Sequence, residues 1–139
     1  MTTLTHLFEN QKWENVVKSY FKKYMEEVYF AKNVVVEMYR KLENENLTIY
    51  RVHYTFISGF SYVFNEKIEI NRKLQKLKSN IDTRLVFENC FYSVDEKNPK
   101  NILYKQYFDV IFGFSGKKKE AFNKGIEIMD KILKRDFIL

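Results

Sequence analysis

The sequence predicts an α+β domain: a long N-terminal helix, an antiparallel sheet of about four strands and an amphipathic C-terminal helix. Three patterns support this prediction. Apolar residues repeat at heptad spacing through residues 12–45, alternate with polar residues from 50 to 70, and recur at helical spacing after residue 116. The chain has 139 residues with four glycines and one proline, so we expect a single domain, residues 1–139, with few interruptions.

Residues 12–45 are predicted to form one long helix, with residues 1–11 before it as a flexible tail. Steps of four and three separate the main apolar residues, which is typical of a coiled-coil seam. At about 1.5 Å per residue, such a helix is longer than a small sheet is wide, so part of it would pack outside its own domain. We therefore expect a homodimer or higher oligomer that associates through Val17, Phe21, Tyr24, Val28, Ala31, Val35, Met38 and Leu42.

Residues 50–70 alternate with a period of two, which is typical of half-buried strands. We expect the even positions to face the core, because they carry most of the apolar and aromatic side chains. Ser58-Gly59 is either a tight hairpin turn or a bulge in one bent strand. Residues 71–82 fit a short helix or a connecting arm, and two later segments have strand composition with a Pro99 loop between them: 83–94 and 102–114.

The chain is expected to end in a basic amphipathic helix, with an apolar stripe formed by Phe122, Ile126, Met129 and Leu133. The alternative is an all-α bundle. Asn98-Pro99 is also a good helix start, and residues 99–113 and 82–95 would then be helical. The alternation between residues 50 and 70 is what the bundle explains worst.

Few residues in the sequence suggest catalysis. The histidines are His6 and His53, and the lone cysteine, Cys90, excludes an internal disulfide and any multi-cysteine metal site. No spacing typical of a zinc or calcium site or of a phosphate-binding glycine loop occurs. Cys90, His53 and Asp109 are the residue types of a nucleophilic set, but their spacing does not support one. We expect a protein that is not an enzyme and uses no cofactor or metal.

The net charge is +6, and the excess of positive charge is concentrated in two segments. One surrounds residues 72–78, and the other begins where the last helix begins. Lysines at a helix start have the wrong sign for the helix dipole, so a phosphate bound there would provide a physical reason for them. The alternative is a solvated turn. The residues expected to contact nucleic acid, a nucleoprotein or an acidic partner are Lys117, Lys118, Lys119, Lys124, Arg72, Lys73, Lys76 and Lys78.

The segment Gly116-Lys117-Lys118-Lys119-Glu120-Ala121 follows an aromatic strand pattern. It resembles the G-x-x-K-K-x-A start of the last helix in double-stranded-RNA-binding domains. In that family such lysines grip phosphates across a groove, so the resemblance implies this role for Lys118 and Lys119. It covers one short segment. Gly125 and Ile126 stand where the family has a pair of small residues, so the likeness concerns local chemistry and not membership.

The sequence also suggests a second class of function. With 17% aromatic residues, the protein could present an aromatic surface or its long helix to a protein partner. It would then be an adaptor, a chaperone or an inhibitor, for example a phage-encoded inhibitor of a host defence system. We expect a cytoplasmic protein without a membrane partner, because no signal-peptide pattern or long apolar run occurs.

Overall fold

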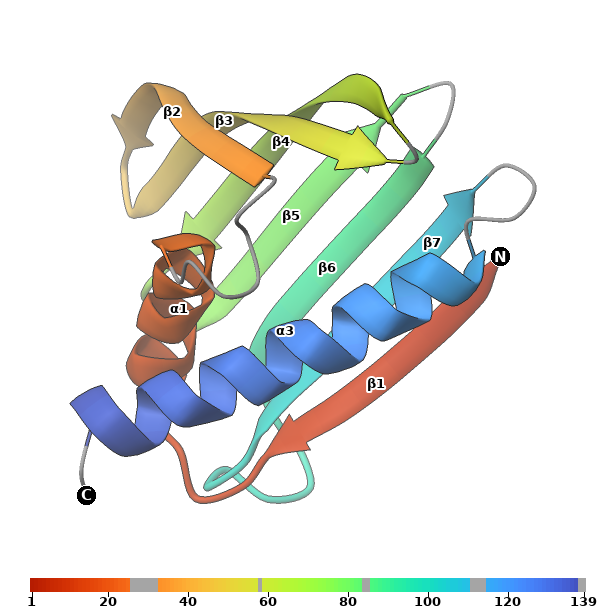
Figure 1. Ribbon diagram of the computed structural model, residues 1–139. Helices are drawn as coiled ribbons and strands as arrows, with labels where there is room; N and C mark the ends of the chain where they lie inside the picture. The colour runs from red at the N-terminus through yellow and green to blue at the C-terminus, as the bar shows by residue number, and fades with distance from the viewer. Residues whose placement is uncertain (26–32, 58, 84–85, 111–114, 138–139) are drawn as a thin grey trace.

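The computed structural model describes residues 1–25, 33–57, 59–83, 86–110 and 115–137 (Figure 1). Over these residues, seven strands form one antiparallel sheet in the order β1-β7-β6-β5-β4-β3-β2. The elements are β1 Thr2–Phe8, α1 Trp13–Lys22, the 3-10 turn η1 Lys23–Met25, β2 Asn33–Glu43, β3 Asn46–Ile57, β4 Phe60–Asn71, β5 Lys76–Asp82, β6 Val86–Val94, β7 Ile102–Val110 and α3 Ser115–Asp136.

The sheet is a meander from β2 to β7, in which each strand pairs with the next along the chain. The first strand, β1, closes the far edge by pairing with β7, from Thr2 opposite Phe108 to Phe8 opposite Ile102. Both α1 and α3 lie on one face of the sheet, which curves around them (Figure 1). We call this helix-covered face the inner face and the opposite one the outer face.

The core lies between the inner face and the two helices. The apolar stripe predicted on the last helix is confirmed, since all four of its residues are buried. Phe122 of this stripe stacks on Tyr104 of β7, with ring centroids 4.9 Å apart, and Tyr104 stacks on Tyr92 of β6 at 4.2 Å. At the other end of α3, Asp136 forms an ion pair with Lys22 of α1 at 3.0 Å. Packing of this apolar face holds α3 on the sheet.

The predicted long N-terminal helix is wrong. The first helix has ten residues, and Asn33–Glu43 is a strand that pairs along its length with β3. The run Val34-Val35-Val36 is β-branched and favours an extended backbone. The heptad residues therefore share no helix face: Val17, Phe21 and Tyr24 pack in the core, Val35, Met38 and Leu42 lie on β2, and Val28 and Ala31 lie outside the described residues.

The all-α alternative is also wrong, because the segments it required hold β6 and β7. Of the two interpretations of Ser58-Gly59, the hairpin is confirmed by the residues around it, since Ile57 pairs with Phe60 and Gly59 has a φ of 82°, while Ser58 itself lies outside the described residues. Residues 71–82 are neither helix nor arm, since they contain the end of β4, a turn and β5. Residues 2–8, expected within a flexible tail, form β1.

The orientation of β3 also differs from the prediction. Its odd positions face inward, so Leu47, Ile49, Arg51 and His53 are buried, while the even-numbered Tyr50 and Tyr54 are exposed. Side chains alternate between the two faces of a sheet. A strand whose odd positions face inward, and not its even positions, therefore has every side chain on the face opposite to the predicted one. In the part of the chain that the structure describes, no helix is long and apolar enough to cross a membrane.

Candidate ligand groove and polar interior

A buried carboxylate, that of Glu66 on β4, is the centre of a hydrogen-bond network inside the fold. Its Oε1 accepts from Arg51 Nη2 at 2.7 Å and contacts His53 Nε2 at 2.8 Å. Its Oε2 accepts from the hydroxyl of Tyr20 at 2.5 Å and from the hydroxyl of Ser79. Burial opposes ionisation, but the contact with His53 and the charge of Arg51 outweigh it and hold the pKa of Glu66 below its usual range.

A second carboxylate, that of the half-buried Glu88 on β6, pairs with Lys118 of α3. Gln106 Nε2 donates to Glu88 at 2.7 Å, and the thiol of Cys90 donates to it at 3.2 Å. Burial opposes both charges. The positive charge of Lys118 nevertheless lowers the pKa of Glu88, and the negative charge of Glu88 raises the pKa of Lys118. Lys118 therefore points inward and has a charge partner within the protein.

The other residues of the expected helix-start site are placed as follows. Lys119 is exposed, Lys124 is half-buried, and the side chain of Lys117 lies outside the described residues. Because Lys118 is paired with Glu88, a phosphate site at this helix start would have to use Lys117 and Lys119. The resemblance to double-stranded-RNA-binding domains assigned phosphate contact to Lys118 and Lys119, and only Lys119 of these is exposed.

The second predicted basic cluster lies elsewhere. Arg72 and Lys73 are exposed in the β4–β5 turn, and Lys76 and Lys78 are exposed on the outer face of β5. The start of α3 is over Glu88, near the beginning of β6, whereas Lys76 pairs with Ser93 near the end of that strand. Lys76 and Lys78 therefore lie at the other end of the sheet from the start of α3 and on the opposite face of it.

The residues considered for nucleophilic catalysis do not come together. Cys90 and His53 are buried on the inner face, whereas Asp109 is exposed and pairs in register with the outer-face residue Phe87. Burial raises the pKa of the Cys90 thiol far above its usual value, which disfavours the nucleophilic thiolate. Among the described residues, no group of three or more His, Cys, Asp or Glu side chains is placed to hold a metal ion.

A groove of about 520 Å³ runs between α1 and the inner side of β2, β3 and β4. Its floor is apolar. Trp13, Val17 and Phe21 project from α1 at intervals of four residues, which places them on one face of the helix. Opposite them lie Leu47 and Ile49 of β3 and Ile70 of β4. This volume lies within the usual range for small-molecule sites.

Charged side chains form the rim of this groove: Glu14, Lys18, Arg40 and Arg72. Arg40 is paired with Glu37, with Nε–Oε1 at 3.0 Å and Nη2–Oε2 at 3.2 Å. Lys18 and Arg72 have no carboxylate within ion-pair distance among residues that the structure describes. With the Glu37 carboxylate counted beside Arg40, three cations and two carboxylates give the rim a formal charge of +1, so an anionic group is favoured there.

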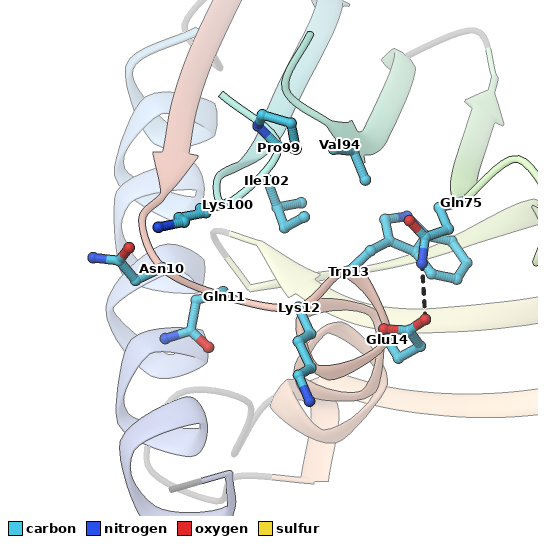
Figure 2. A pocket seen from close by; sticks show the side chains of 10 residues that line it. All are labelled: Asn10, Gln11, Lys12, Trp13, Glu14, Gln75, Val94, Pro99, Lys100 and Ile102. Atoms are coloured by element: carbon cyan, nitrogen blue, oxygen red, sulfur yellow. Dashed lines mark hydrogen bonds between the residues drawn. The ribbon is translucent and has the colours of Figure 1, made fainter. Parts of the chain in front are cut away.

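A second, more open hollow of about 380 Å³ lies at the N-terminal end of α1 (Figure 2). It shares Trp13 and Glu14 with the groove. Figure 2 shows Gln75 of the β4–β5 turn reaching Glu14, with Nε2 donating to Oε1 at 2.8 Å. Trp13 donates from Nε1 to the carbonyl oxygen of Tyr92 at 3.1 Å. These two bonds fix the wall between the groove and the hollow.

The groove was missed in the sequence because the 12–45 segment was interpreted as one helix. Val17 and Phe21 were recognised as apolar, but they were assigned to a surface for self-association. Arg40 was placed on the same helix, whereas it lies on β2 and faces α1 across the groove. The signal that was present is the four-residue spacing from Trp13 to Phe21, which marks one face of a short helix.

Comparison with known proteins gives the fold alone. No protein-family model matches the sequence, and no curated protein is similar to it. The structure is similar to the solution structure of the 18 kDa protein CC1736 from Caulobacter crescentus, with a TM-score of 0.56 and 6% identity over 96% of this chain and 90% of that one. It is also similar to the crystal structure of TTHA0849 from Thermus thermophilus, with a TM-score of 0.57 and 8% identity over 97% and 99% of the two chains.

Proposed function

We propose that this protein is a non-catalytic binding protein that holds a small amphipathic anion in the groove between α1 and the sheet. The ligand would have an alkyl or aromatic body and one anionic group, such as a carboxylate. The observation that carries the proposal is the apolar groove floor beneath the rim cations of Lys18 and Arg72. Small-molecule sites typically combine an apolar lining with a few polar groups that orient the ligand.

Two physical terms favour this ligand class. Apolar surface removed from water contributes about 25 cal/mol per Å² before the costs of association, which favours a ligand body that covers Leu47, Ile49 and Val17. The rim cations add attraction for an anion and disfavour a cation of the same shape. We expect the protein to act in the cytoplasm, and its single, unpaired cysteine, Cys90, supports a reducing compartment.

The test is a binding comparison between ligands with a twelve-carbon chain and head groups of opposite charge. Anilinonaphthalene sulfonate, an anionic dye that fluoresces in apolar sites, is titrated into the protein and then displaced with dodecanoate or with dodecyltrimethylammonium. We expect dodecanoate to displace the dye and the cation to fail. Equal displacement by both ligands would show that the rim does not select charge, which contradicts the proposal.

Variants locate the binding site. Arg72→Glu and Lys18→Glu lie on the rim and are expected to weaken dodecanoate binding by roughly fivefold or more each, about 1 kcal/mol. Val17→Phe places a larger side chain in the floor and is expected to reduce dye binding. The matched control is Lys131→Glu, which makes the same charge change at an exposed position of α3. Dodecanoate affinity that depends equally on Lys131 and Arg72 would place the binding outside the groove.

A further inference from the structure

The outer face of the sheet carries an aromatic side chain between two lysines. In the strand register, Phe91 on β6 lies directly opposite Lys78 on β5 and directly opposite Lys105 on β7. Directly opposed residues of antiparallel strands have side chains on the same face, with Cβ atoms about 5 Å apart. Lys78 Nζ is 5.8 Å from the centroid of the Phe91 ring. The three side chains therefore form one row across the sheet.

Neighbouring rows extend this surface. Lys76 is exposed one row away on β5, and the ring of Tyr107 meets Phe91 edge to face, with centroids 5.8 Å apart. Lys67 on β4 is paired with Glu69 at 3.3 Å. By contrast, Lys76, Lys78 and Lys105 have no carboxylate within ion-pair distance in the described part of the chain. These three lysines are therefore in no ion pair with a described carboxylate, although Glu69 of β4 lies directly opposite Lys78 in the strand register.

The surface is also hollowed. Two adjoining depressions, of about 610 and 690 Å³, share Leu74, Lys76, Phe91 and Ser93 in their linings. Lys105 lines the first together with Asp95 and Glu96, and Lys78 and Lys67 line the second together with Glu43 and Glu69, so lysines exceed carboxylates in each lining by one. The helices α1 and α3 lie on the other face of the sheet (Figure 1), so neither of them covers these depressions. Phe91 itself is half-buried, which leaves part of its ring accessible.

We propose that the outer face binds single-stranded nucleic acid, with a base stacked on Phe91 and the flanking phosphates held by Lys76, Lys78 and Lys105. Proteins that bind single strands combine a positively charged surface with aromatic side chains on which bases stack. A duplex keeps its bases paired and stacked within the helix, so its bases could not use Phe91. An acidic protein could use the lysines but would gain nothing specific from an aromatic ring between them.

This proposal is independent of the ligand groove, which lies on the inner face. It also differs from the site expected at the start of α3. Lys118 is in an ion pair with Glu88, whereas Lys76, Lys78 and Lys105 are in no ion pair with a described carboxylate. Lys76 and Lys78 belong to both the predicted basic cluster and this surface. Lys105 and Phe91 were not recognised, because their position beside Lys78 depends on the strand register.

Fluorescence anisotropy with labelled oligothymidylate and oligouridylate tests the proposal, with a duplex of mixed sequence as the comparison. We expect both single strands to bind at about 50 mM salt, more tightly than the duplex, and to weaken between about 50 and 200 mM salt. Absence of single-strand binding at the lower salt concentration would overturn the proposal, and so would tighter binding of the duplex.

Three variants separate stacking from charge. Phe91→Leu keeps an apolar side chain but removes the ring, and we expect roughly 5- to 150-fold weaker binding with an unchanged salt slope. Lys78→Gln and Lys105→Gln should each reduce the slope of log affinity against log salt by about 0.7. Lys131→Gln on α3 is the control and should change neither quantity. Equal effects at Lys131 and Lys78 would mean that binding depends only on the net charge of the protein, which contradicts the proposed surface.

Polyglutamate provides the remaining comparison. Polyglutamate is compared with unlabelled oligothymidylate at the same concentration of charges. If the two displace labelled oligothymidylate equally well, and if Phe91→Leu changes the affinity for neither of them, the surface is a general polyanion site and the stacking proposal is wrong. If Phe91→Leu weakens only the oligonucleotides, the proposal is supported. The circular dichroism spectrum and urea midpoint of each variant establish that it is folded before its affinity is compared.

Discussion

Arg51 and Glu66 face each other across the β3–β4 hairpin, with 2.7 Å between Nη2 and Oε1 and side chains that are 5% and 2% exposed. Two charges so deeply buried are stable only when their remaining hydrogen bonds are satisfied. Tyr20 and Ser79 donate to the second carboxylate oxygen, and Arg51 also donates from Nε to Oε1 at 2.9 Å. The pair therefore links α1 and the strands β3, β4 and β5.

The first prediction is that Arg51→Met destabilises the protein by about 3–5 kcal/mol, because it leaves the Glu66 carboxylate buried without its charge partner. The measurement is urea unfolding followed by circular dichroism. Arg40→Met is the matched control, because Arg40 lies on the adjacent strand and its pair with Glu37 is exposed. Such surface pairs contribute about 0–1 kcal/mol. Equal losses in the two variants would show that burial of the Arg51–Glu66 pair has no special energetic role.

The second prediction concerns acid. The pKa of Glu66 is lowered in the folded protein, and so is that of Glu88. A carboxyl group with a lowered folded-state pKa contributes stability above its unfolded pKa, which is about 4.3 for Glu. That contribution is lost as the pH falls from there through the folded-state pKa. The free energy of unfolding should therefore drop steeply below about pH 4.3, and more gently in Glu66→Gln. Parallel pH profiles for the two proteins would contradict this assignment.

Strands β3 and β4 and the C-terminal helix could be predicted from local patterns, because a period of two and a 3.6-residue stripe survive in the sequence of residues 46–71 and 115–136. Three of the seven described strands, β1, β2 and β5, were not predicted. The structure of the first third of the chain could not be predicted in this way. Heptad spacing at residues 17–42 arises because α1 and β2 each place apolar residues at intervals that happen to continue one another. The β-branched run at residues 34–36 was the contrary signal, and it favours a strand.

The inward face of β3 could have been derived from the length of the hairpin, because a two-residue turn puts odd-numbered residues of β3 on the same face as even-numbered residues of β4, such as Ile49 with Ile68. A tight turn at Ser58-Gly59 sets Arg51 opposite Glu66, which is the register that β3 and β4 adopt. Opposite charges directly across a hairpin stabilise that register. The count of apolar residues pointed to the other face, since Tyr50, Val52, Tyr54 and Phe56 are all even-numbered. The network around Glu66 is a tertiary feature, because Tyr20 and Ser79 reach it from other elements.

The third prediction separates two neighbouring lysines. Lys118→Met should destabilise the protein by about 2 kcal/mol, because the half-buried carboxylate of Glu88 would lose its cation. Lys119→Met should change stability by less than about 0.5 kcal/mol, since Lys119 is exposed. Urea midpoints of the two variants provide the comparison. A larger loss at Lys119 than at Lys118 would be incompatible with the ion pair to Glu88.

The fourth prediction concerns Cys90, whose thiol is buried beside Glu88 and Gln106. Burial and the negative charge of Glu88 raise the pKa of this thiol. Since the thiolate is the reactive form, the native protein should react with Ellman's reagent on the order of 100-fold or more slowly than the urea-unfolded protein. Absorbance of the released thionitrobenzoate measures both rates, and the sequence has one cysteine, so the signal belongs to Cys90.

Asn80→Ser, a change on the outer face, should leave the native rate unchanged, whereas Glu88→Gln should alter it by removing the neighbouring charge. Fast reaction in the native state would mean that the thiol is accessible and ionised, and it would reopen the case for Cys90 as a nucleophile.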